Sequence, residues 1–63
     1  MSAKADYKRI DAETRVADQA YYPVRDAYRA GTISDAEYLA ARKIWEAAHA
    51  RWEVARAAAY PGT

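Results

Sequence analysis

Two long stretches of the chain carry apolar residues at alternating spacings of three and four, which is typical of one face of an α-helix. The first stretch covers about residues 3–30 and the second about residues 35–59. The other side of each stretch is mostly polar and is predicted to face solvent, with Asp11 and Asp18 on that side of the first stretch. The pattern therefore predicts an all-α protein of two helices with a short tail over residues 60–63. The predicted inward positions are Tyr7, Ile10, Thr14, Ala17, Tyr21, Val24 and Tyr28, and then Tyr38, Ala41, Trp45, Ala48, Trp52, Ala55 and Ala59.

Residues 31–34 are predicted to form a tight turn between the two helices. Gly31 suits the left-handed backbone that often follows the last residue of a helix. Ser34 suits the N-cap of the second helix, and Glu37 is placed to accept a hydrogen bond from the Ser34 backbone N–H in a capping box. Thr32 alone receives no structural role from this pattern. The turn therefore predicts an antiparallel helical hairpin.

Counting outward from this turn sets the register of the two helices. Most layers then combine a larger side chain with a smaller one, which favours close packing of the helices. The predicted layers are Tyr28/Tyr38, Val24/Ala41, Tyr21/Trp45, Ala17/Ala48, Thr14/Trp52, Ile10/Ala55 and Tyr7/Ala59.

Pro23 falls inside the first predicted helix. A proline in a helix interior removes one backbone hydrogen bond and costs about 3 kcal/mol. The helix either kinks at Pro23 or breaks there, giving one helix to about Tyr22 and a short one from Pro23 to Ala30. The three–four spacing passes through Pro23 without a change of phase, which favours the kink.

Composition narrows the classes of function. Ten lysines and arginines balance nine acidic residues over both halves of the chain, so neither nucleic acid nor an anionic membrane surface is an expected partner. No cysteine is present for a disulfide or a thiolate metal site. No apolar run approaches the roughly 20 residues of a membrane span. The first six residues lack the apolar core of a signal peptide, so a cytoplasmic protein is expected.

Candidate catalytic chemistry is sparse. His49 is the only histidine and lies at helical spacing from Glu46 and Glu53, which is a poor metal site without further ligands. We expect it to be exposed within a ladder of charges. No nucleophile has a base at a recognisable spacing, and no glycine-rich phosphate loop is present. The sequence therefore predicts a protein that is not an enzyme and has no cofactor and no metal site.

An apolar strip remains outside the predicted hairpin core. Exposed strips of this length mark interaction surfaces, and a chain of 63 residues buries only about 60% of its unfolded surface alone. Arg51 interrupts the strip and is placed either to extend its charged end into solvent or to pair across an interface with Glu13. We expect an antiparallel dimer that forms a four-helix bundle. The predicted interface is Val16, Ala20 and Ala27 on the first helix and Ala40, Ile44, Ala47, Arg51, Val54 and Ala58 on the second.

The residues Gly31, Ile33, Ser34, Glu37 and Tyr38, followed by Arg42-Lys43, resemble the short C-terminal oligomerisation modules abbreviated SHOCT. The resemblance covers about residues 25–45 and implies self-association, although alanine and tryptophan stand where that family has aliphatic residues. The layout is also similar to small phage and plasmid helical hairpins. Two alternatives to a module that only self-associates therefore stay open. One is a phage- or mobile-element-encoded inhibitor or adaptor that binds a host helical protein through the same strip, and the other is a nucleic-acid-binding dimer of the Rop type.

Overall fold

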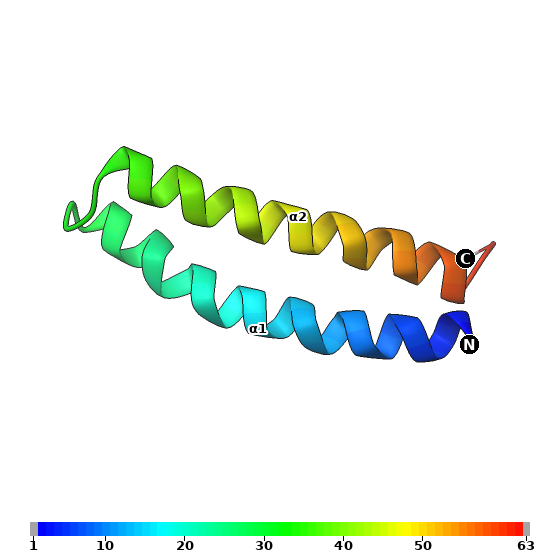
Figure 1. The fold of residues 1–63 in the computed structure, drawn as a ribbon. Helices are drawn as coiled ribbons and strands as arrows, with labels where there is room; N and C mark the ends of the chain where they lie inside the picture. The colour runs from blue at the N-terminus through cyan, green and yellow to red at the C-terminus, as the bar shows by residue number, and fades with distance from the viewer. Residues whose placement is uncertain (1, 63) are drawn as a thin grey trace.

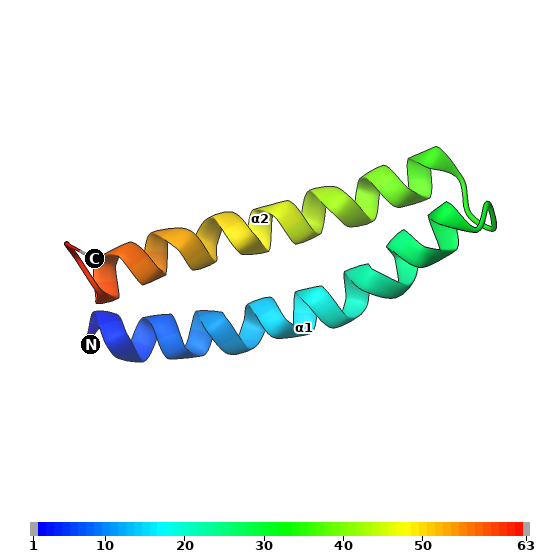
Figure 2. The same cartoon turned by 180° about the vertical axis from the view of Figure 1, so that it is seen from behind.

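The computed structural model describes residues 2–62 and consists of two long helices joined by a tight turn (Figure 1). Helix α1 spans Ala3–Arg29 and helix α2 spans Asp35–Ala59. The helices run antiparallel along a rod that measures 43 × 17 × 17 Å. The first residues of α1 and the last residues of α2 lie together at the end opposite the turn (Figures 1 and 2). The predicted all-α hairpin is confirmed.

Serine caps define the start of both helices. The Glu37 backbone N–H donates to the Ser34 hydroxyl at 3.1 Å, as the sequence predicts. The Glu37 carboxylate differs from the prediction, because it accepts from the Ser34 hydroxyl at 3.3 Å instead of from the Ser34 backbone N–H. Ser2 caps α1 in the same way, since it accepts from the Ala5 N–H at 3.1 Å. Each cap satisfies a backbone donor that has no partner inside its helix.

The turn after α1 has the hydrogen bonds of a Schellman motif. Gly31 has a φ of +77°, and its N–H donates to the Tyr28 carbonyl at 3.0 Å. The Thr32 N–H donates to the Ala27 carbonyl at 3.0 Å, and the Thr32 hydroxyl donates to the same oxygen at 3.0 Å. The prediction that Thr32 has no structural role is therefore wrong. The Thr32 side chain therefore links the connecting loop to the last turn of α1 through this hydrogen bond.

Helix α1 continues through Pro23 without interruption, so the alternative of a broken helix is wrong. Because proline has no N–H, the carbonyl one turn earlier loses its helical partner. The ribbon of α1 changes direction between its N-terminal and C-terminal halves and stays beside α2 along its length (Figures 1 and 2). The proline therefore bends the helix around its neighbour and leaves it in one piece.

Aromatic stacking sets the register of the two helices. Tyr28 stacks on Tyr38 with ring centroids 4.2 Å apart, and Tyr21 stacks on Trp45 with centroids 4.5 Å apart. These contacts confirm two of the predicted layers. The Tyr21 and Tyr38 hydroxyls are also joined by a hydrogen bond of 3.1 Å. Near the turn, the contact between α1 and α2, which we call the seam, is therefore held by stacked rings and by a hydrogen bond between side chains.

The core along the rest of the seam is thin. Only five of the described residues are buried, and among residues 2–62 none of the large side chains is completely shielded from solvent. The accessible surface is 4781 Å², against about 4,100 Å² for an average folded monomer of this mass. The hairpin therefore leaves unusually much of its surface uncovered. The buried residues are Thr14, Tyr21, Ala48, Ala55 and Ala59.

Candidate protein-interaction face

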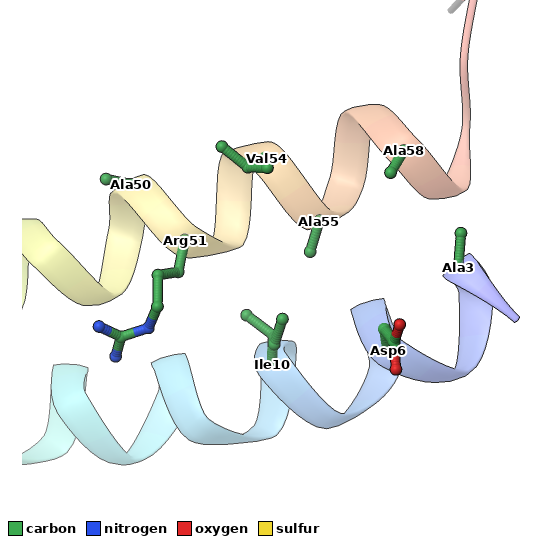
Figure 3. Close-up of a pocket in the computed structure, with 8 residues that line it drawn as sticks. All are labelled: Ala3, Asp6, Ile10, Ala50, Arg51, Val54, Ala55 and Ala58. Atoms are coloured by element: carbon green, nitrogen blue, oxygen red, sulfur yellow. The ribbon is translucent and has the colours of Figure 1, made fainter. Parts of the chain in front are cut away.

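One long side of the hairpin is an apolar face, which we define by two open grooves between α1 and α2. The larger groove has a volume of about 480 Å³ and lies toward the chain ends (Figure 3). The smaller groove has a volume of about 130 Å³ and lies toward the turn. Ala3, Asp6, Ile10, Ala50, Arg51, Val54, Ala55 and Ala58 line the larger groove, and Ala17, Ala20, Tyr21, Ala41, Ile44 and Trp45 line the smaller one.

The residues predicted for the interface lie at the surface. Ile44 is 71% exposed, Val54 is 72% exposed and Val16 is 65% exposed. Ala20, Ala40, Ala47, Arg51 and Ala58 are also exposed, and Ala27 is half-buried. Five of the nine line one of the two grooves, namely Ala20, Ile44, Arg51, Val54 and Ala58.

Leu39 is a further exposed apolar residue that the sequence interpretation missed. It is 58% exposed and lies with Arg42, Lys43 and Glu46 on another side of α2, away from both grooves. It is neither one of the predicted inward positions of the second helix nor part of the predicted apolar strip, which explains why periodicity did not select it. Its position makes it a natural control for substitutions on the apolar face.

Arg51 is the one charged residue that α2 contributes to the larger groove. Its side chain extends from α2 toward α1, and Ile10 and Ala55 point toward each other beside it (Figure 3). Within residues 2–62 its guanidinium makes neither a hydrogen bond nor an ion pair. A guanidinium stays charged at all physiological pH values and offers five N–H donors. Among residues 2–62 no carboxylate therefore lies within ion-pair distance of this cation of the apolar face.

The other side of the seam carries polar contacts between the helices. The Trp52 indole N–H donates to Asp11 Oδ1 at 2.8 Å. The Trp45 indole N–H donates to Asp18 Oδ1 at 2.7 Å, and His49 Nε2 lies 2.7 Å from the same oxygen. Asp11 directly follows Ile10, and Asp18 directly follows Ala17. One residue is a rotation of about 100° around α1, so the two aspartates lie on the other side of the helix contact from the grooves.

These contacts correct two expectations. Asp11 and Asp18 are not simply part of a solvated face, because each holds a tryptophan of α2. His49 does not stand exposed between Glu46 and Glu53, because it is half-buried, pairs with Asp18 and packs against the Trp45 ring at 4.5 Å. The signal available in the sequence was that the predicted register places each aspartate within about one helical turn of a tryptophan, whose N–H needs an acceptor when it is partly buried.

The contact with His49 lowers the pKa of Asp18 below its ordinary value of 3.8, and the Trp45 hydrogen bond lowers it further. Partial burial opposes this shift. A lowered pKa means that the ionised carboxylate is favoured in the folded state. Its contribution to stability is therefore present above the unfolded-state pKa and is lost as the pH falls through the lower, folded-state pKa.

Acid should therefore weaken the hairpin in part through Asp18. We expect the free energy of unfolding, measured by urea titration, to fall between neutral pH and about pH 2. At neutral pH the Asp18→Asn variant should have a lower free energy of unfolding than the parent, and this free energy should fall less as the pH is lowered. The matched control is Glu53→Gln, an exposed carboxylate on α2, which should follow the parent protein. Equal pH dependence of Asp18→Asn and the parent would contradict the assignment.

Across residues 2–62 no three histidine or acidic side chains gather closely enough to hold a metal ion. In the same part of the chain neither helix is long and apolar enough to cross a membrane. The hairpin is therefore a rod with the apolar face on one side of the seam and polar contacts between the helices on the other side.

The fold and this face define a two-helix α-hairpin with an uncovered apolar side. Comparison with protein-family models, with curated proteins and with solved structures found no match. The function is therefore inferred from the apolar face itself.

Proposed function

We propose that this protein is a non-catalytic self-association module in which two hairpins pack by their apolar faces into a four-helix bundle. The observation that carries the proposal is the exposure of Ile44 and Val54, at 71% and 72%, beside open grooves that contain few polar atoms. Single exposed apolar residues are ordinary on protein surfaces. A continuous face that runs along both helices is typical of an interaction surface.

The size of the face supports a dimer. A rod of 43 × 17 Å presents a footprint of about 700 Å² on one long side, close to the roughly 800 Å² that each partner buries in a standard interface. A second hairpin of the same length covers this side completely. It would also reduce the excess of exposed surface that the thin core leaves.

Light scattering across a concentration series tests the proposal, with an expected mass of twice that of one chain. Ile44→Glu should lower the mass to that of one chain and partly unfold the protein, because it places a charge in a desolvated interface. Leu39→Glu changes a residue of similar size and exposure away from the grooves, so it should remain dimeric. A parent protein that is a stable monomer throughout, unaffected by Ile44→Glu, would overturn the proposal.

A further inference from the structure

Two hairpins can join by their apolar faces around two different twofold axes. An axis along the rod places both turns at the same end, so that α1 lies on the partner's α2. An axis across the rod places the turns at opposite ends, so that α1 lies on the partner's α1 and α2 on the partner's α2. Neighbouring helices are antiparallel in both arrangements, so helix direction does not favour one arrangement over the other.

The register of the hairpin locates Arg51 along the rod. Starting from the Tyr21–Trp45 stack and counting six residues outward along each helix places Arg51 level with Arg15. Glu13 is two residues from this level, or about 3 Å along the helix axis. It follows Ile10 by three residues and precedes Ala17 by four, so it lies on the side of α1 that forms the grooves.

Charge separates the two arrangements. With the turns at the same end, Arg51 lies across the interface from the partner's Glu13, and the symmetric pair forms as well. With the turns at opposite ends, Arg51 and the partner's Arg51 lie on either side of the middle of the rod, about 9 Å apart along its axis. Two long arginine side chains can approach each other across that distance. Like charges that meet in an interface are strongly unfavourable. An arginine that forms no ion pair within the described part of its own chain favours the arrangement that supplies one.

Glu13 is available for such a pair. Over residues 2–62 its only ion pair is with Arg9 at 3.6 Å, through Oε2, and its side chain is 53% exposed. Exposed pairs of this kind contribute little to stability. A carboxylate accepts several hydrogen bonds, so Glu13 can bind an incoming guanidinium and keep its contact with Arg9.

Side-chain size points to the same arrangement. The larger exposed residues of the apolar face, Ile44 and Val54, belong to α2, whereas α1 contributes Ala17 and Ala20 to the smaller groove. With the turns at the same end, Ile44 meets the partner's α1 near the partner's Ala20, whereas Val54 lies close to the level of the partner's Ile10 and Glu13. With the turns at opposite ends, large residues meet large ones and alanines meet alanines, which packs less closely.

We infer that the second copy of this chain docks with its turn at the same end as the first, and that Arg51 and the partner's Glu13 fix this arrangement. The inference rests on the proposed self-association and revises the expectation of hairpins that run antiparallel to each other. Arg51 then acts as a specificity residue, because it penalises the alternative pairing.

Charge reversal tests the ion pair. Arg51→Glu and Glu13→Arg should each raise the dimer dissociation constant about tenfold or more, since each creates two like-charge contacts. The double variant restores opposite charges and should bring the constant back close to that of the parent. If the turns lie at opposite ends, Glu13→Arg should change little. A double variant that does not recover would overturn the inference.

Label distances test the arrangement directly. The chain has no cysteine, so Arg29→Cys near the turn and Lys8→Cys near the chain ends can each carry one spin label. With turns at the same end, each dimer should give a short distance, set by the bundle width of about 20 Å. With turns at opposite ends, the Arg29→Cys labels would be about 35 Å apart along the axis alone. A dimer with long distances overturns only the arrangement, whereas a monomer overturns the proposed function as well.

Discussion

Replacing Trp45 by alanine is expected to unfold the hairpin at room temperature. The ring stacks on Tyr21 at 4.5 Å, packs against His49 at 4.5 Å and donates its N–H to Asp18 at 2.7 Å. Removing a large aromatic side chain from a core costs about 3–5 kcal/mol, whereas a domain of 63 residues has about 3–9 kcal/mol in total. Far-ultraviolet circular dichroism should show loss of most of the helical signal.

Trp45→Phe is the matched control for this experiment. Phenylalanine keeps an aromatic ring against Tyr21 but cannot donate to Asp18. Asp18 keeps its contact with His49. We therefore expect this variant to remain helical and to lose about 1.5–3 kcal/mol, the range for one hydrogen bond to a charged group. A Trp45→Ala protein that melts at the same temperature as the parent would show that the stack does not hold the helices together.

Ala48→Leu is expected to be the second most damaging of these substitutions. Ala48 is 4% exposed, the lowest value among the buried residues, and it faces another alanine, Ala17, in the predicted layers. Extra methyl groups in a packed seam force the helices apart and cost about 1–3 kcal/mol. Urea unfolding should show this loss.

The control for this change is Ala57→Leu. Ala57 is exposed on the same helix, and leucine and alanine have similar helix propensities. We expect its free energy of unfolding to stay within about 0.5 kcal/mol of the parent. If Ala48→Leu were equally neutral, the seam would contain room for a larger side chain and the assigned packing would be wrong.

The layout of the hairpin could be read from the sequence because its signals are local. Gly31 and Ser34 terminate and start helices through contacts within four residues, and the structure has both features. The Tyr28/Tyr38 and Tyr21/Trp45 layers follow from counting away from a turn of known length. Pro23 was ambiguous, because a kink and a break differ only in whether the surrounding contacts compensate for one missing hydrogen bond.

The interhelical polar contacts were not foreseen because periodicity sorts residues by polarity alone. Asp11 and Asp18 lie at the edge of the seam, and a helical wheel assigns any charged residue there to solvent. Their actual role depends on whether an indole N–H from the other helix reaches them, which is a property of the packed pair. The exposure of the apolar face follows from the sequence pattern, and its partner remains a prediction.

The meeting of both helix ends at one end of the rod has a consequence for how the hairpin attaches to anything else. Chain ends that lie together permit a domain to be placed within a loop of another protein with little disturbance. If the hairpin is linked to another domain at this end, it would project from that domain by about 43 Å. The Gly31 turn would then lie farthest from the attachment. In a dimer with both turns at the same end, two such attachments would emerge side by side.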